Sequence, residues 1–272
     1  LVLLLVGAFL YLLLLCHRVD LDKEQEYDDR HYRKVLELYV ESALPVLRVN
    51  VRTKGMNKVP TDRRFLLVCN HLNNLDPVLL LHFFNKSQLA FISKRENTTM
   101  FLVGKLMHKL MCQLVHREND REALKTIISC IRLIQEDQVS VGVFPEGRIT
   151  GDDLLHPFRS GVFKIAQKAK VPIVVCTMKG TSDLFHNMKR LKRTHVRLHL
   201  VDVIDAEEVA AANTVECGIN YAQVGVAKNI SVDSAIKHRL YIILVALCIG
   251  DLSLGKVLGV VGIEVLVQAA VV

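Results

Sequence analysis

The sequence lacks the cysteine patterns of proteins that are held together by disulfides or metal ions. Its seven cysteines are scattered, with no Cys-x-x-Cys pair and no spacing typical of metal ligands. Neither a disulfide framework nor a zinc site is therefore indicated, and we expect no bound metal. The same usage of cysteine is typical of a reducing location that faces the cytosol.

Two further patterns are missing. No Gly-x-Ser-x-Gly nucleophile elbow occurs, which argues against a serine lipase. No internal repeat or low-complexity linker occurs either, so we expect one domain with short appendages.

The chain is basic, with a net charge of +7 and a pI near 9.0. This charge suits nucleic acid or the anionic face of a cytoplasmic leaflet. No glycine-aromatic RNA-binding signature accompanies it, so we predict a membrane surface and no nucleic acid. The densest basic run has two interpretations, a solvated face or a membrane contact. It comprises Lys189, Arg190, Lys192, Arg193 and Arg197.

The first residues are apolar and uncharged up to Cys16. Residues 1–16 fall slightly short of the roughly 20 that a helix needs to cross a bilayer. We expect a retained membrane anchor, complete or truncated, rather than a cleaved signal peptide. Residues 17–49 mix charged and apolar side chains, which predicts an amphipathic helix from Asp20 to Tyr39 near the membrane surface, ended by Pro45.

From Arg63 onward, short apolar runs alternate with helical ones, a pattern typical of an α/β sheet in which helices connect the strands. The predicted strands are Phe65 to Cys69, Gln88 to Ser93, Val139 to Phe144, Val171 to Cys176 and Val196 to Val203. One predicted helix begins at Asn119 or Asp120, and another spans Ser160 to Lys170. The apolar tail, residues 226–272, has no assigned role.

His71 and Asp76 form a His-x-x-x-x-Asp element directly after a predicted strand. Ligands of open α/β sheets bind at such strand ends, and a carboxylate on one imidazole nitrogen leaves the other ready to take a proton. The pattern also occurs at His17 and Asp22, where no strand precedes it, so that copy is treated as fortuitous. A structural histidine and an ordinary helix N-cap at Asp76 remain the alternatives.

Other polar loops also follow predicted strands and are expected at the same sheet edge. Glu146 and Arg148 flank Gly147, offering an acceptor for a hydroxyl and a cation for a phosphate. Lys94 follows a second strand, and Arg117 precedes a helix, where phosphate is commonly bound. A surface ion pair is the alternative for the Glu146 loop.

Together these blocks resemble the lysophosphatidic acid acyltransferase branch of the glycerolipid acyltransferase family, from about Asn50 to Val203. The matching blocks are Asn70-His71 with Asp76-Pro77, Phe91 to Glu96, Val115 to Asn119, Phe144 to Gly147, and Val171 to Val175. The resemblance implies a mixed central β-sheet flanked by helices over residues 50–225. It also implies that His71 is the general base, oriented by Asp76. Arg117, Glu146 and Gly147 would then bind glycerol phosphate, and the Val-Pro block would line the acyl site.

The implied reaction transfers a fatty acyl group from acyl-CoA or acyl carrier protein to 1-acyl-glycerol-3-phosphate, giving phosphatidic acid without a cofactor. The family loop usually reads Phe-Pro-Glu-Gly-Thr-Arg-Ser, whereas this chain has Ile149 at the arginine position. Arg148 or Arg159 is expected to supply that charge. The alternatives are another lysophospholipid or glycerol phosphate as acceptor, and a non-catalytic lipid-binding protein.

Overall fold

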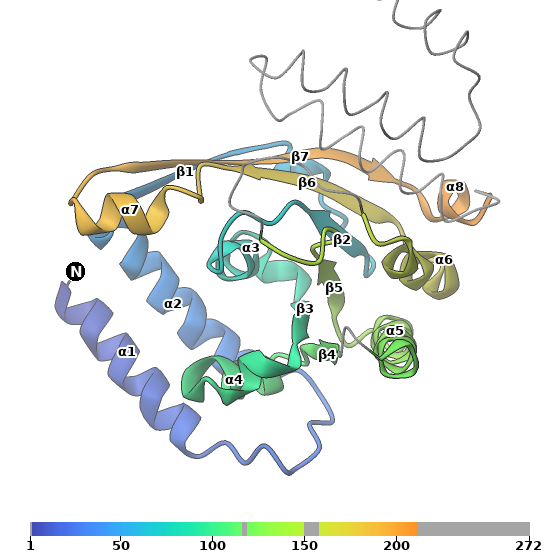
Figure 1. The fold of residues 1–272 in the computed structure, drawn as a ribbon, viewed down its shortest axis with the longest axis horizontal. Helices are drawn as coiled ribbons and strands as arrows, with labels where there is room; N and C mark the ends of the chain where they lie inside the picture. Colours follow the sequence, from blue (N-terminus) through green and yellow to red (C-terminus); the bar gives the residue numbers. More distant parts are fainter. Residues whose placement is uncertain (1, 116–118, 150–157, 212–272) are drawn as a thin grey trace, which may run out of the picture. The chain divides into compact units, whose positions relative to one another are not determined.

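The computed structural model describes residues 2–115, 119–149 and 158–211, which form a mixed sheet flanked by helices (Figure 1). The seven strands lie in the order β1-β7-β6-β2-β5-β3-β4. Only β6 and β7 pair antiparallel, and the other neighbours are parallel. The expected mixed α/β sheet is therefore confirmed. The strands are β1 (Val49–Lys54), β2 (Leu66–Cys69), β3 (Leu89–Lys94), β4 (Gln113–Val115), β5 (Ser140–Val143), β6 (Ile173–Lys179) and β7 (Thr194–Ile204).

All five predicted strands are present, together with two strands, β1 and β4, that were not predicted. Strand β1 is mostly exposed, so its sequence carries little of the apolar signal of a core strand. Strand β4 has only three residues, too few for any period to be visible. Both lie at the edges of the sheet, where burial constrains the sequence least.

Eight α-helices and four short 3₁₀ turns accompany the sheet in the described residues. The helices are α1 (Val2–His17), α2 (Arg30–Val46), α3 (Asp76–Phe83), α4 (Phe101–Lys109), α5 (Asp120–Gln135), α6 (Lys164–Ala169), α7 (Leu184–Lys189) and α8 (Ala206–Ala211). The 3₁₀ turns are η1 (Met56–Lys58), η2 (Asn85–Ser87), η3 (Arg95–Thr99) and η4 (Ser160–Phe163). Helix α5 begins as predicted, because the Asn119 side chain accepts from the backbone N–H groups of Arg121 and Glu122.

The predicted amphipathic helix is present but begins later than expected. Asp29 caps α2, so the charged segment from Asp20 to Asp28 is not helical. Pro45 lies inside the last turn instead of ending the helix. Helix α1 packs against α2, with the rings of Phe9 and Tyr39 5.8 Å apart. Within the described residues, no helix combines the length and apolarity needed to span a membrane. The apolar N-terminal segment forms α1, and its role as a membrane anchor stays a prediction.

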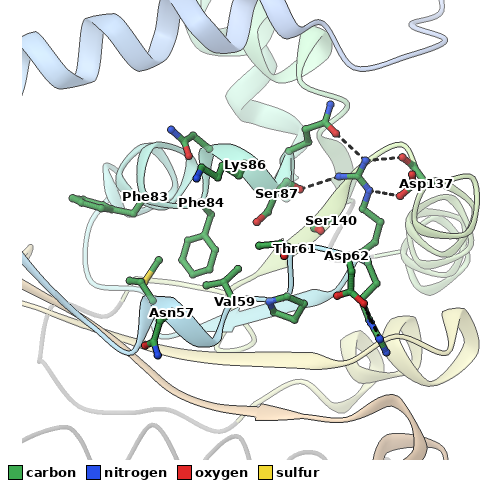
Figure 2. Close-up of a pocket in the computed structure, with 16 residues that line it drawn as sticks. Asn57, Val59, Thr61, Asp62, Phe83, Phe84, Lys86, Ser87, Asp137 and Ser140 are labelled. Carbon is green, nitrogen blue, oxygen red and sulfur yellow. Dashed lines mark hydrogen bonds and ion pairs between the residues drawn. The ribbon is translucent and has the colours of Figure 1, made fainter.

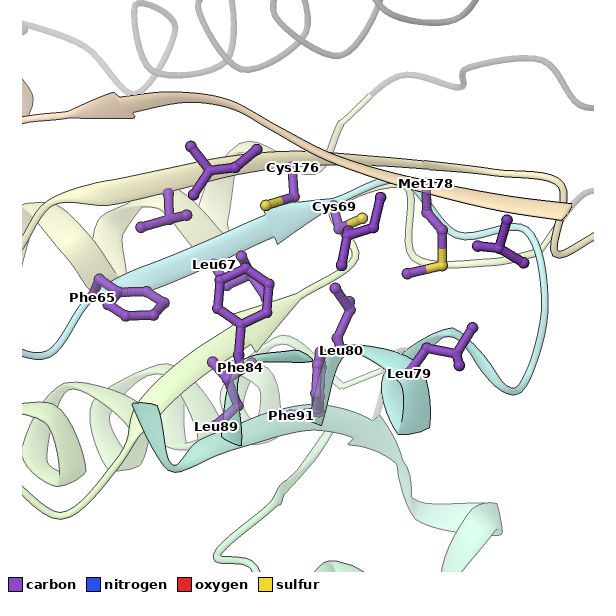
Figure 3. Packing of buried hydrophobic residues seen from close by; sticks show 14 of the residues in the cluster. Phe65, Leu67, Cys69, Leu79, Leu80, Phe84, Leu89, Phe91, Cys176 and Met178 are labelled. Atoms are coloured by element: carbon purple, nitrogen blue, oxygen red, sulfur yellow. The ribbon is translucent and has the colours of Figure 1, made fainter. Parts of the chain in front are cut away.

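The main core lies between the sheet and α3 (Figure 3). Phe65, Leu67 and Cys69 alternate along β2 and are completely buried, as expected for one face of a strand. Leu79 and Leu80 of α3 pack in the same cluster. The burial of β2 and α3 fixes the loop that joins them, residues 70–75, at the carboxyl end of the sheet.

The chain leaves β2 towards β3 and leaves β5 towards β6, so the two connections run in opposite directions along the sheet. Right-handed crossovers of this kind place their helices on opposite faces. The chain segments that follow β2 and β5 therefore start from adjacent strand ends and continue to opposite faces of the sheet, and such strand ends are where open α/β sheets bind ligands.

Candidate active site

His71 and Asp76 are in direct contact in the loop between β2 and α3. His71 Nδ1 lies 3.0 Å from Asp76 Oδ2. Asp76 is completely buried, whereas 16% of the His71 side chain is exposed. When Nδ1–H of His71 donates to Asp76 Oδ2, Nε2 is left as the imidazole nitrogen that can take a proton.

The Asp76 carboxylate accepts hydrogen bonds from the loop that precedes it in the chain. Its Oδ2 also accepts from the backbone N–H groups of Leu72 and Asn73, each at 2.7 Å. The alternative of an ordinary helix N-cap does not hold, since Asp76 is the first residue of α3 and makes no side-chain cap bond to the helix. Its Oδ1 is buried and has no hydrogen-bond partner within the described part of the chain. One oxygen thus fixes both the loop and the imidazole.

Two asparagines tie this loop to β6 and the turn after it. Asn70 Nδ2 donates to the Met178 carbonyl at 2.9 Å, and Asn70 Oδ1 accepts from the Met178 N–H at 2.7 Å. Asn73 Nδ2 donates to the Thr181 carbonyl at 3.0 Å. Both asparagines are buried. Neither asparagine was among the predicted site residues, although two amides in a loop after a buried strand indicate such bonds.

A stack of three rings holds the plane of the imidazole. The ring of His71 lies 4.1 Å from that of Phe144 at an interplanar angle of 16°. Phe144 in turn stacks on Phe91, with a centroid distance of 5.4 Å. A Cβ at Gly142 would clash with the Phe91 ring, so glycine leaves the room that this ring needs. The stack joins β3, β5 and the β2–α3 loop at one sheet edge.

The loop after β5 also contacts the His71 loop. The side chain of Glu146 is buried, and its Oε1 accepts from the His71 backbone N–H at 3.1 Å. Gly147 has φ +73°, which favours glycine. Arg159 lies beside it, because a Cβ on Gly147 would stand 3.0 Å from Arg159 Nε. Arg148 is exposed.

The remaining predicted binding residues are only partly placed. Lys94 is exposed at the carboxyl end of β3, the strand beside β5. Arg117 lies outside the described residues. The Val171 to Val175 block lies at the start of β6, where Ile173 pairs with Leu66 at the start of β2. This block is therefore at the opposite end of the strands from His71. His17, of the second His-x-x-x-x-Asp copy, is exposed at the end of α1.

A cavity of about 610 Å³ lies at the amino end of the strands (Figure 2). Arg64 and Ser140, next to the starts of β2 and β5, line it. The Arg64 guanidinium bonds to the side chains of Asp137 and Gln88 at 2.7 and 2.8 Å. Because His71 follows the other end of β2, this cavity is separate from the His71 site.

Cys69, two residues before His71, is completely buried. Burial is the main reason that the pKa of its thiol lies well above the usual value. The neighbouring Cys176, Asp76 and Glu146 raise that pKa further. The thiol therefore stays protonated at neutral pH and does not provide a thiolate nucleophile.

We expect Cys69→Ala to retain the activity that the family resemblance implies within about threefold, with a loss of roughly 1 kcal/mol of stability for the small cavity. Turnover assays and thermal unfolding of the purified variant measure both quantities. Cys130→Ala, another buried cysteine, is the matched control. A Cys69→Ala protein that folds normally but is inactive would contradict this expectation.

Residues 50–179 match the family model named Acyltransferase. The chain is 32% identical over 169 residues to a probable 1-acyl-sn-glycerol-3-phosphate acyltransferase of Mycoplasma pneumoniae, covering 61% of this chain and 62% of that protein. It is 29% identical over 173 residues to the Bacillus subtilis 1-acyl-sn-glycerol-3-phosphate acyltransferase, covering 62% and 84%. The aligned region thus spans about three fifths of the Mycoplasma relative.

The fold is similar to the crystal structure of the 1-acyl-sn-glycerophosphate (LPA) acyltransferase PlsC from Thermotoga maritima. The TM-score is 0.63 at 22% identity, covering 86% of this chain and 96% of the other. The family match begins just after the start of β1 and ends at the last residue of β6, so it contains His71, Asp76 and Glu146. The likeness to the Acyltransferase family model therefore extends over residues 50–179, just under half of the chain, and includes the loops that follow β2 and β5.

Proposed function

We propose that this chain transfers a fatty acyl group from a thioester to the free hydroxyl of 1-acyl-glycerol-3-phosphate, giving phosphatidic acid. The observation that carries the proposal is the bond between His71 and the buried Asp76, which leaves Nε2 of a partly exposed imidazole available as a base. The names of the relatives support the same reaction.

In this mechanism His71 takes the proton of the acceptor hydroxyl as the hydroxyl oxygen attacks the thioester carbonyl. The tetrahedral intermediate then collapses and releases the thiol, which recovers the proton. Asp76 stabilises the positive imidazolium while that proton is held. The step needs no covalent enzyme intermediate, no metal and no cofactor.

The acceptor phosphate would be bound by cations around the site, with Lys94, Arg117 and Arg148 as the proposed residues. Arg159 joins them, because its side chain lies against Gly147 where the family loop usually has its own arginine. An arginine that enters from a different segment also favours a second acceptor class, another lysophospholipid or glycerol phosphate. Glu146 binds the His71 loop, so its proposed contribution to acceptor binding includes holding that loop in place.

Helix α1 supports a proposed location at a membrane surface on the cytoplasmic side. It is apolar throughout, and one side of it is exposed in the described structure. The exposed large apolar side chains include Leu3, Leu10 and Leu14. Contiguous exposed apolar surface of this kind is typical of helices that lie in the membrane interface.

The proposal is tested by thiol release from purified protein in detergent micelles, with acyl-CoA or acyl carrier protein as donor. The acceptors would be 1-acyl-glycerol-3-phosphate, lysophosphatidylcholine, lysophosphatidylethanolamine and glycerol 3-phosphate, with products identified by mass spectrometry. We expect phosphatidic acid as the main product. Thiol release with another acceptor only would identify the alternative enzyme, and lipid binding without any thiol release would identify a non-catalytic protein.

A further inference from the structure

The turn between α7 and β7 exposes apolar side chains among cations. Phe185 of α7 is 45% exposed, and Leu191 of the turn is 74% exposed. Leu184 and Met188 occupy the inner side of α7 and pack in the core, so the exposure of Phe185 is not caused by local unfolding. The exposed cations around the two apolar side chains are Lys189, Arg190, Lys192, Arg193 and Arg197. We call these seven residues the α7–β7 patch.

The backbone of Leu191 is held in an unfavourable conformation. Its φ is +52°, a left-handed value that glycine and asparagine tolerate better than leucine. The turn is nevertheless well ordered by hydrogen bonds, since the Leu191 N–H bonds to the Met188 carbonyl at 3.1 Å. Arg48 Nη1 donates to the Leu191 carbonyl at 2.8 Å. A strained backbone that presents a leucine to solvent indicates a role outside the described chain.

The patch lies at the same end of the molecule as the first turn of α1. Helices α1 and α2 run antiparallel, because Phe9 stacks near Tyr39 while Leu15 accepts from the Tyr32 hydroxyl. The start of α1 thus lies beside the end of α2. Helix α2 ends two residues before Arg48, and Arg48 bonds to Leu191 of the patch. Figure 1 shows α7 and the start of α1 at the same side. The apolar start of α1 and the basic patch can contact one flat surface together.

The α7–β7 patch is also connected, through hydrogen bonds, to the loop between β2 and α3 that contains His71. Asn73 bonds to the Thr181 carbonyl three residues before α7 begins, and Asn70 bonds to Met178 near the end of β6. A surface bound to the patch would therefore lie near the edge of the sheet at which His71 is partly exposed. This is the arrangement needed to reach a lysophospholipid that stays in the membrane.

We propose that the α7–β7 patch docks on an anionic lipid bilayer, with Leu191 and Phe185 inserted at the headgroup level and the cations bound to lipid phosphates. The charge of the patch is complementary to anionic lipid, and the two apolar side chains fit the acyl boundary beneath the headgroups. The inference deepens the proposed function by naming the surface that meets the acceptor's membrane. The binding itself requires no acyl transfer.

Leu191→Asn gives the sharpest test, because asparagine accepts the left-handed backbone while removing the apolar side chain. We expect binding to phosphatidylcholine vesicles that contain phosphatidylglycerol to weaken by roughly tenfold in sedimentation assays. The unfolding temperature should stay the same or rise. Turnover in detergent micelles should be unchanged, so a failure of the proposed reaction and a failure of docking give different results. Ile128→Asn on α5, which removes another exposed apolar side chain, is the control and should bind as the parent protein does.

Charge-reversal variants distinguish binding of the patch to a bilayer from binding to an acidic protein. Lys192→Glu with Arg193→Glu should weaken binding to anionic vesicles by at least about tenfold, and added salt should reduce the difference. Lys164→Glu with Lys168→Glu, two exposed cations on α6, is the control. Unchanged vesicle binding in Leu191→Asn or in the patch charge variant would overturn the proposal. A loss of activity with acyl carrier protein but not with acyl-CoA, without a loss of vesicle binding, would identify the patch as a protein-docking surface instead.

Discussion

Replacing His71 by alanine is expected to slow thiol release by roughly 10²- to 10⁴-fold, the usual contribution of a positioned general base. The imidazole is oriented by Asp76 at Nδ1 and by the Phe144 ring on its face, so removing it removes a positioned base. The protein should still fold, because the loop keeps its bonds from the backbone N–H groups of Leu72 and Asn73 to Asp76. Steady-state rates in detergent, with circular dichroism as the folding check, measure both outcomes.

The matched control is His82→Ala, which removes an imidazole from the helix that begins at Asp76. His82 Nδ1 is buried without a hydrogen-bond partner in the described structure, so its loss should alter stability more than turnover. We expect its rate to stay within about threefold of the parent protein. A folded His71→Ala protein with full activity would rule out His71 as the base and leave the lipid-binding alternative.

The helices and strands that could be predicted from the sequence are those whose burial produces a recognisable pattern of apolar residues. Strand β2 is completely buried, so Phe65 to Cys69 reads as a continuous apolar run. Helix α5 carries both a cap and a spaced apolar face. Strand β1 has a weaker apolar pattern, because it forms by pairing with β7, more than a hundred residues away in the chain. The segment before α2 likewise has no clear apolar pattern.

The candidate site was predictable as a set of loops but not as a set of contacts. That His71 and Asp76 follow a buried strand can be read from the sequence, whereas the bonds from Asn70 and Asn73 to β6 depend on which strands are neighbours. Glu146 was expected to face substrate, and its carboxylate proves to accept from the His71 backbone. Sequence separation does not reveal such contacts, because it does not specify strand order.

Asp76→Asn is expected to lower turnover by about 2- to 30-fold with less effect on the acceptor KM. Three donors converge on Oδ2, so the asparagine oxygen should take that place and keep accepting from His71 Nδ1. The geometry then persists while the negative charge is lost. A hydrogen bond to a charged group is worth ~1.5–3 kcal/mol and a neutral one about 1 kcal/mol, and roughly 1.4 kcal/mol corresponds to a factor of ten.

The variant should also lose roughly 1–3 kcal/mol of stability, because its amide nitrogen would occupy the buried Oδ1 position, which has no partner in the described structure. Asp28→Asn separates the two effects. Asp28 is a buried carboxylate that lies just before α2 and pairs with Arg33 at 2.7 Å, and it also accepts from Gln88 Nε2 at 3.2 Å. It should lose stability and keep its turnover rate. If both variants lost turnover equally, Asp76 would act only through the stability of the fold; if Asp76→Asn alone lost it, the carboxylate charge would be acting on His71 during acyl transfer.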